Sequence, residues 1–119
     1  MLRHSTNTAS FFPALMAALI FSLSLAGVAA AQTNTSLGTH ALVSNTTGSE
    51  NTAVGFQTLF SNTTGSANTA SGVNALVFNT TGINNTATGV NALLSNTTGG
   101  ANTAVGVNAL AGNTDGGAI

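Results

Sequence analysis

A seventeen-residue unit recurs in tandem along most of this chain. Every copy opens with Asn-Thr, has Gly at its fifth position and Leu at its ninth, and turns at Asn-Thr-x-Gly. Self-similarity at a fixed period is typical of arrays in which each unit packs only on its neighbours. The chain is therefore expected to form one stack of repeats. The copies begin at Asn34, Asn51, Asn68, Asn85 and Asn102.

The first 31 residues differ from everything that follows. They contain the only Lys or Arg of the chain, Arg3, then an apolar run and a series of small residues that ends at Ala31. This order predicts a secretory signal peptide over residues 1–31, cleaved after Ala30 or Ala31. The alternative is a retained membrane anchor, because residues 14–31 are just long enough to span a bilayer. We favour cleavage, since two serines and a glycine weaken the second half of the run and no basic residue follows it.

Cleavage after Ala31 would leave one small domain, residues 32–119, of unusual composition. It contains no Lys, Arg or Cys, and its acidic residues are Glu50 and Asp115. Without cations it has no basic surface for nucleic acid or anionic lipid, and without Cys it cannot be stabilised by disulfides. Abundant Asn and Thr could indicate low-complexity disorder, but aliphatic residues in register favour an ordered fold. We expect neither nucleic-acid binding nor membrane insertion of the mature chain.

The repeated unit indicates β-structure, because it is rich in Asn, Thr and Gly and has no apolar stripe at helical spacing. In the second copy, residues 54–60 alternate as a strand does, and residues 61–66 follow as a turn in which Gly65 is expected to have positive φ. A shorter extended piece precedes Gly55, which marks the corner between the two. Two short strands and two turns make one rung. The predicted fold is all-β, a parallel β-solenoid (β-roll) of about five 17-residue rungs after a helical signal peptide.

Two columns, meaning sets of residues at the same position in successive units, are expected to shape every rung. Gly fills the fifth column, where the chain is expected to bend, to approach another backbone or to have positive φ. Asn fills the first, where amides stacked at a strand spacing of about 4.8 Å can bond to one another. Ligand binding by these amides is the functional alternative. The structural repeat positions are Asn51, Asn68, Asn85, Asn102, Gly55, Gly72, Gly89 and Gly106.

The ninth column is Leu in every unit and indicates self-association. Columns six, eight and ten are mostly small and apolar, so strand alternation places Leu on the opposite face. A strand that is apolar on both faces is normally buried on both, and an identical chain presents matching residues at matching heights. The alternative is that Leu points into the coil while columns six to ten line a looser, partly exposed wall. The predicted interface residues are Leu42, Leu59, Leu76, Leu93 and Leu110.

Residues 32–119 offer little for catalysis. His40 and Glu50 lie near one end of the array, and Asp115 lies near the other. His40 takes the place in column seven that Gln or Asn fills in later units, which indicates a polar surface position and not a general base. No acidic run predicts a calcium site, no His and Cys set predicts a zinc site, and no nucleotide-binding pattern surrounds the paired glycines. We therefore predict no enzyme activity, no metal and no cofactor.

Asparagine glycosylation sequons are frequent in the chain. Most arise from the repeat itself, because every Asn-Thr-Thr turn generates one, and they matter only in a cell that glycosylates secreted Asn. They lie at Asn34, Asn45, Asn62, Asn79, Asn84 and Asn96.

The unit Asn-Thr-Ala-Val-Gly-x-Asn-Ala-Leu followed by Asn-Thr-Thr-Gly is best seen at residues 85–99 and 102–110. It resembles the YadA-like head repeats of trimeric autotransporter adhesins, and similar arrays occur in phage tail-fibre-like proteins. The resemblance covers residue 34 to about 117. It implies a left-handed parallel β-roll that assembles as a homotrimer on the bacterial surface and binds host matrix proteins or other surfaces. The chain departs from that family in its longer period, and it contains neither a heptad stalk nor a C-terminal membrane barrel.

Our first functional hypothesis is an extracellular or surface-exposed, adhesin-like structural protein that mediates attachment through its repetitive surface. The second is an ice-binding solenoid, because Thr forms a regular second column, although the fourth column two residues on is irregular. The third is a self-assembling fibre subunit, since low charge and open solenoid ends invite end-to-end pairing.

Overall fold

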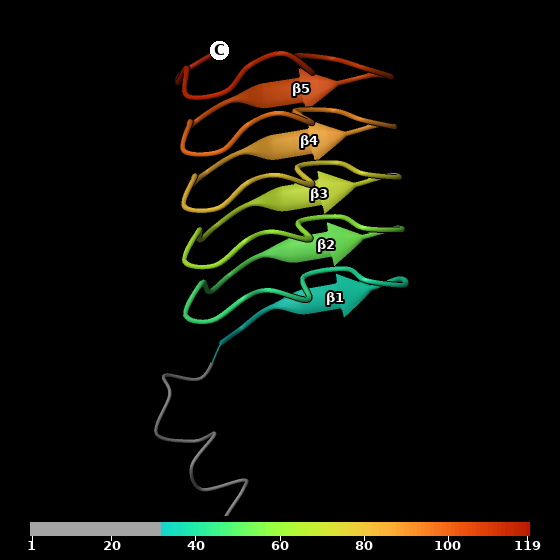
Figure 1. Cartoon of the computed structure of the whole chain (residues 1–119), viewed down its shortest axis with the longest axis vertical. Helices are drawn as coiled ribbons and strands as arrows, with labels where there is room; N and C mark the ends of the chain where they lie inside the picture. The colour runs from blue at the N-terminus through green and yellow to red at the C-terminus, as the bar shows by residue number, and fades with distance from the viewer. Residues whose placement is uncertain (1–31) are drawn as a thin grey trace, which may run out of the picture. The chain divides into compact units, whose positions relative to one another are not determined.

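The computed structural model describes residues 32–119, which form a solenoid with one β-strand in every repeat (Figure 1). These strands make a single parallel sheet in the order β1-β2-β3-β4-β5. The prediction of an all-β parallel solenoid is therefore confirmed, whereas the predicted signal peptide, residues 1–31, lies outside the described residues. The strands are β1 (Thr35–Leu37), β2 (Thr52–Val54), β3 (Thr69–Ser71), β4 (Thr86–Thr88) and β5 (Thr103–Val105).

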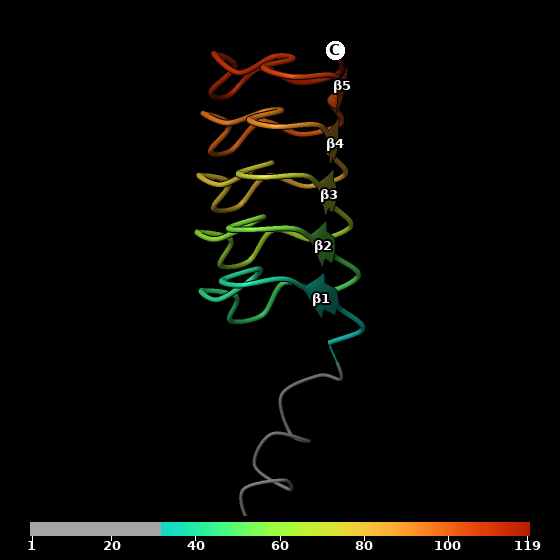
Figure 2. The same cartoon turned by 90° about the vertical axis from the view of Figure 1, so that its right-hand side faces the viewer.

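Successive strands pair with an offset of one full repeat, so that Thr35 lies opposite Thr52 and Thr52 opposite Thr69. Each strand covers columns two to four, where Thr and Val favour the extended backbone. The rest of each unit leaves the sheet and returns to it one rung further along (Figure 2). Within the described range, no helix is both long and apolar enough to cross a membrane.

The second strand expected over residues 54–60 is not formed. Gln57 and Leu59 both have left-handed backbones, with φ of 55° and 49°, and such residues interrupt the alternation of a strand. The same two columns are left-handed in every rung, so each rung has one strand instead of two. These residues are His40, Leu42, Gln57, Leu59, Asn74, Leu76, Asn91, Leu93, Asn108 and Leu110.

The residues that follow the corner glycine, 56–60 in the second rung and their counterparts in the others, form what we call the irregular segment. Its backbone is still hydrogen-bonded to both neighbouring rungs. The N–H of Gln57 donates to the carbonyl of Thr39 in the rung before, at 3.0 Å. The N–H of Leu59 donates to the carbonyl of Ala75 in the rung after, at 3.1 Å. Inter-rung bonding therefore continues outside the sheet, which satisfies polar groups that would be costly to bury unpaired.

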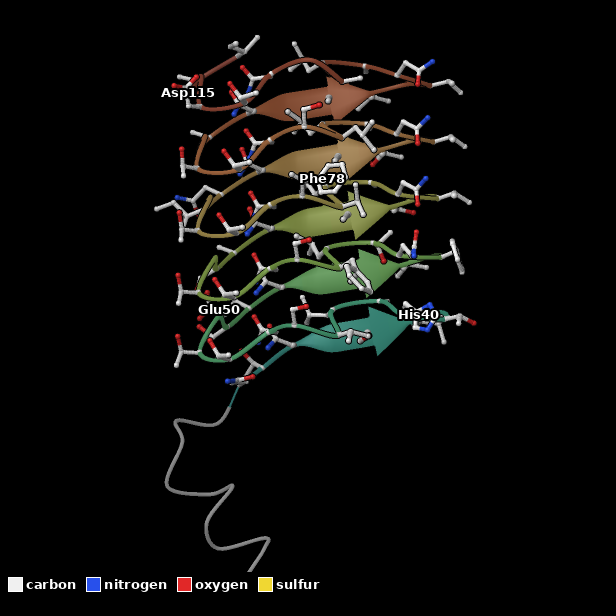
Figure 3. All side chains as sticks on the ribbon, in the orientation of Figure 1. His40, Glu50, Phe78 and Asp115 are labelled. Atoms are coloured by element: carbon white, nitrogen blue, oxygen red, sulfur yellow. The ribbon has the colours of Figure 1, made fainter. Side chains whose placement is uncertain are left out.

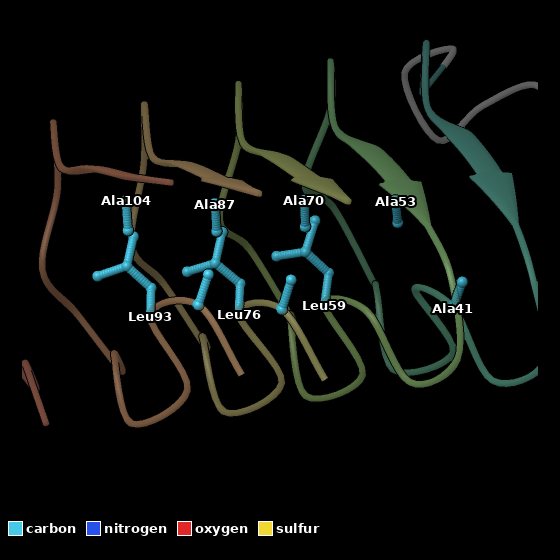
Figure 4. Close-up of a cluster of buried hydrophobic side chains, with 10 residues drawn as sticks. Ala41, Ala53, Leu59, Ala70, Leu76, Ala87, Leu93 and Ala104 are labelled. Carbon is cyan, nitrogen blue, oxygen red and sulfur yellow. The ribbon is translucent and has the colours of Figure 1, made fainter. Parts of the chain in front are cut away.

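The leucine column forms the core of the coil. Leu59, Leu76 and Leu93 are 0% exposed, and Figure 4 shows Leu76 pointing toward Ala87 of β4. The prediction that the leucine column faces a partner subunit is wrong, because these side chains are already buried within one chain. The alternative holds in part: Leu points inward, but the exposed wall does not extend over columns six to ten, because column eight is buried with the leucines. The two left-handed residues in each rung explain the error. Side chains alternate between two faces only along an extended backbone, so the face of Leu cannot be found by counting residues here.

The glycines of column five make tight corners, as predicted. Gly72 has φ of 126°, and a Cβ on it would lie 2.7 Å from the carbonyl oxygen of Gly89 in the next rung. Gly106, in the last repeat, has φ of 124° but no atom within 4 Å of such a Cβ. Two separate requirements, backbone angle and close approach, therefore select glycine in the inner rungs.

Candidate functional site

The first-column asparagines form the predicted ladder through the interior of the solenoid. The amide nitrogen of Asn68 donates to Oδ1 of Asn51 at 3.1 Å and to the carbonyl of Gly82 at 2.8 Å. Oδ1 of Asn68 accepts both the backbone N–H and the side-chain amide of Asn85, at 3.0 and 3.1 Å. Both N–H groups and both lone pairs of this buried amide are thus used within the chain, which favours the structural interpretation over ligand binding.

A second asparagine ladder runs along column twelve, and the sequence analysis missed it. Nδ2 of Asn79 donates to Oδ1 of Asn62 at 2.8 Å and to the carbonyl of Gly82 at 3.1 Å. The sequence predicts only a turn over residues 61–66, although the invariant spacing of Asn and Gly was the available signal for a ladder. The two ladders meet in each rung, because Asn68 and Asn79 donate to the same Gly82 carbonyl.

The glycine of the turn has a different role from the one expected. Gly65 does not have positive φ; instead, Ala67 two residues later is left-handed, with φ of 56°. A Cβ on Gly65 would lie 2.3 Å from Oδ1 of Asn62 and 2.5 Å from the carbonyl oxygen of Gly82. Glycine is therefore needed here because the buried ladder leaves no room for a side chain.

The ladder also decides which sequons are accessible in the folded chain. Asn62, Asn79 and Asn96 are fully buried, and their amide nitrogens are engaged in the second ladder. Asn84 is exposed. A glycan on the buried positions would be incompatible with the fold, so most sequons are a by-product of the repeat.

The titratable side chains do not converge. His40, Glu50 and Asp115 are all exposed, and Figure 3 shows His40 on the opposite side of the coil from the two carboxylates. The His40 ring packs edge-on against Phe56, with centroids 5.9 Å apart. No group of three potential metal-ligating side chains forms among residues 32–119. The described residues therefore bring together no acid, base and nucleophile for a shared reaction.

The outside of the irregular segment carries an apolar column. Its members are 45%, 41%, 40% and 70% exposed, whereas Thr58, Ala75 and Ala92 of column eight are buried with the leucines. Columns six and eight therefore do not share a face, contrary to the sequence-based alternation. We call this column the apolar wall, and it consists of Phe56, Val73, Val90 and Val107.

The outer face of the sheet carries a threonine column beside an irregular one. Thr35, Thr52 and Thr69 lie in direct register, and the column continues through β4 and β5. The neighbouring fourth column changes from one rung to the next, and its two ends, Leu37 and Val105, are strongly exposed.

Comparison with known proteins adds no family to this description. No family model, no curated protein sequence and no solved structure matches the chain.

Proposed function

We propose that this chain is an exported, surface-exposed structural protein that mediates attachment in the manner of an adhesin head. The observation that carries the proposal is the register of the solenoid, in which each rung repeats the same outward columns one repeat further along. The asparagines inside are occupied by one another and by the backbone, so the outer columns are left for contact. A regular array of weak contacts can give strong attachment through multivalency.

The proposed assembly is a homotrimer, and the apolar wall is the surface we assign to it. Burying one fully exposed Val or Phe contributes roughly 1.5–3 kcal/mol, and the wall residues are 40% to 70% exposed, so each gains about half of that. Walls from several chains together can then offset an association cost of about 4–15 kcal/mol. A second copy is the favoured occupant because its wall repeats with the same spacing. Residues 32–119 also contain no Lys or Arg, so they lack the basic groups that an acidic partner would need.

Molecular mass in solution tests the assembly directly. Sedimentation equilibrium of the full chain should give three chains per particle, and Val73→Asn with Val90→Asn should reduce it to one while the circular dichroism spectrum is retained. The matched control changes two exposed threonines of the sheet, Thr69→Asn with Thr103→Asn, and should remain trimeric. A wild-type monomer at the highest soluble concentration would refute the trimer.

Attachment and export need their own measurements. Binding of the purified protein to immobilised matrix proteins and to inert surfaces should be saturable and should weaken when the outer columns are changed. The protein recovered outside the cytoplasm should begin at Ala31 or Gln32. An intact Met1 on that material would show that the N-terminal segment is retained as an anchor.

Ice binding is a second candidate, favoured by the threonine column in register on the sheet. Ice binding needs a flat lattice of hydroxyl and methyl groups, and therefore a second column that matches the threonine column. The fourth column does not match it, because it contains Leu37, Ser71 and Val105. A thermal-hysteresis assay distinguishes the candidates, because an adhesin-like head should not lower the freezing point below the melting point.

A further inference from the structure

The glycosylation sequon at Asn84 differs in origin from those in the turns. Residues 84–86 read Asn-Asn-Thr, and the sequon exists because Asn occupies column seventeen, directly before the Asn-Thr that opens the fourth unit. In the other units this column holds Glu or Ala. The array itself therefore does not require an asparagine at this position.

The backbone of Asn84 is fixed in the array, whereas its side chain lies at the surface. Its φ is 59°, a conformation that Asn tolerates well, and its N–H donates to the carbonyl of Ser66 at 3.1 Å. The side chain is exposed and belongs to neither of the asparagine ladders of the described interior. The amide of Asn84 can therefore carry a substituent without the loss of a ladder bond.

The buried turn sequons cannot carry a sugar in the folded chain. Asn62, Asn79 and Asn96 are 0% exposed. Nδ2 of Asn79 uses both of its N–H groups, for Oδ1 of Asn62 at 2.8 Å and for the carbonyl of Gly82 at 3.1 Å. A sugar would replace one N–H and would need space where even a Cβ on Gly82 would lie 2.3 Å from Oδ1 of Asn79.

The two sequons of the first rung are also engaged. Asn34 and Asn45 are half-buried, and both donate to the carbonyl of Gly48 at 2.8 Å. Oδ1 of Asn34 accepts the backbone N–H of Asn51, also at 2.8 Å. A sugar on either residue would compete with these bonds, so Asn84 is the sequon that the described solenoid leaves open.

The position of Asn84 is separate from the apolar wall. Asn84 shares column seventeen with Glu50, and backbone bonds keep this column in register through the array. Figure 3 shows Glu50 on the opposite side of the coil from His40, which packs against Phe56 of the wall. A substituent on Asn84 would therefore leave the wall uncovered, and it does not depend on the trimer or on attachment.

A sugar has to be transferred to Asn84 before its rung closes. A transferase must hold the whole sequon, but Asn85 is 1% exposed and its N–H donates to Oδ1 of Asn68 at 3.0 Å. The N–H of Thr86 donates to the carbonyl of Asn102 at 2.8 Å. Since the unfolded chain offers every sequon to the enzyme, the fold acts afterwards, by excluding chains whose ladder asparagines are modified.

We propose that Asn84 is the acceptor of an N-linked sugar, and that the solenoid retains the modification at this position because it folds only when the turn asparagines are unmodified. The co-reactant is a sugar activated by a diphosphate leaving group. Nδ2 of Asn84 attacks the anomeric carbon of this sugar, and the new C–N bond forms as the bond from that carbon to the diphosphate oxygen breaks. The diphosphate leaves with the bonding electrons, and the amide proton passes to a base of the transferase.

The first experiment produces the full chain in bacteria together with a soluble asparagine glycosyltransferase that uses a nucleotide-activated hexose. The soluble, folded protein should carry one hexose, on Asn84, whereas insoluble material should carry hexose on the turn sequons as well. Residues 32–119 contain no Lys or Arg, so a protease that cuts after Phe and Leu is used for mapping. Asn79 and Asn84 then share a fragment, and tandem mass spectrometry of that fragment assigns the sugar.

The second experiment uses variants of the sequon. Asn84→Asp removes the amide but keeps a side chain that tolerates the left-handed backbone, and Thr86→Val removes the hydroxyl of the sequon. Each soluble variant should lose the hexose. The matched control, Thr88→Val, makes the same change in the same strand, at a position outside any sequon, and should keep the hexose. The circular dichroism spectra of all three should match that of the wild type.

Three results would overturn the proposal. Hexose on Asn62, Asn79 or Asn96 of the soluble protein, at the occupancy found on Asn84, would show that the solenoid tolerates sugars in its ladders. Soluble wild-type protein without hexose on Asn84, or Asn84→Asp protein with undiminished hexose, would show that Asn84 is not the acceptor.

Discussion

Asn51 and Asn62 donate their side-chain amides to the same acceptor, the carbonyl oxygen of Gly65, at 2.8 and 2.9 Å. The two residues belong to different ladders, so this carbonyl joins the ladders within each rung. A buried amide that is bonded on all sides is costly to replace, because its partners are left without hydrogen bonds in a dry interior. The solenoid is therefore held together by an amide interior as well as by its leucines.

The first prediction tests the second ladder. Asn79→Ala should lower the free energy of unfolding by about 2–4 kcal/mol, since it removes a donor from Oδ1 of Asn62 and an acceptor from Nδ2 of Asn96. Urea denaturation followed by circular dichroism gives the value. The control, Thr81→Ala, changes an exposed threonine of the neighbouring turn and should cost less than about 1 kcal/mol. Equal losses for the two variants would contradict a structural role for the ladder.

The second prediction separates backbone angle from close approach at the corner glycines. Gly72→Ala and Gly106→Ala introduce the same side chain at φ of 126° and 124°, so both incur strain of about 1–3 kcal/mol. Only the first places a Cβ 2.7 Å from the carbonyl oxygen of the next rung. Gly72→Ala should therefore be the more destabilising, by at least about 1 kcal/mol. Thermal denaturation measures the unfolding midpoints of the two variants. Equal midpoints would disprove the argument from close approach.

The third prediction concerns alanines held in the left-handed region. Ala67 has φ of 56°, a conformation that costs a residue with a Cβ about 1–2 kcal/mol. Ala67→Gly should raise the stability by about 0.5–1 kcal/mol after the entropic cost of glycine is subtracted. Ala70→Gly is the matched control, because Ala70 is a fully buried strand residue, and it should destabilise. Chemical denaturation that finds both variants less stable would show that the strain at Ala67 is already relieved.

The fourth prediction starts from a buried side-chain oxygen that has no hydrogen-bond partner. Asn74 donates to Asn91, and Asn91 to Asn108, at 3.2 and 3.1 Å. Among the buried side-chain atoms of the described residues, Oδ1 of Asn74 alone has no partner. In the rung before it, Gln57 takes the position that Asn fills later.

Gln57→Asn should therefore extend this third ladder by one bond. The expected gain is about 0.5–1.5 kcal/mol, and Asn also tolerates the left-handed backbone at this position better than Gln does. Gln57→Ala should show no gain in the same denaturation assay. Stability unchanged in the Asn variant would mean that water already satisfies the orphaned oxygen.

Much of this architecture follows from the period alone. A seventeen-residue repeat that never changes length predicts a stack in register, and the pairing of Thr35 with Thr52 is one consequence. The corner at Gly72 and the bonding of Asn68 to Asn51 were also predictable, because Gly and Asn each have few structural reasons to recur at one position.

The direction of the leucine column was not predictable by counting. Alternation assumes that every residue is extended, whereas Leu76 itself is left-handed, with φ of 53°. Leucine rarely adopts this conformation, so nothing in its side chain signals it. The array imposes the conformation, because Leu76 fills the core and its N–H donates to the carbonyl of Ala92 in the next rung at 3.0 Å.

The strict register of the rungs also has a consequence for how such a chain can change in length. Every ladder joins a residue to the one seventeen positions away, as Asn62 joins Asn79. A gene duplication or deletion that adds or removes one whole unit reconnects each column to itself, so recombination between repeats yields a longer or shorter solenoid with the same interior. Loss of a single residue would instead misalign both asparagine ladders and the leucine core at one junction. Unequal crossing-over can therefore lengthen or shorten the solenoid while its interior contacts stay the same.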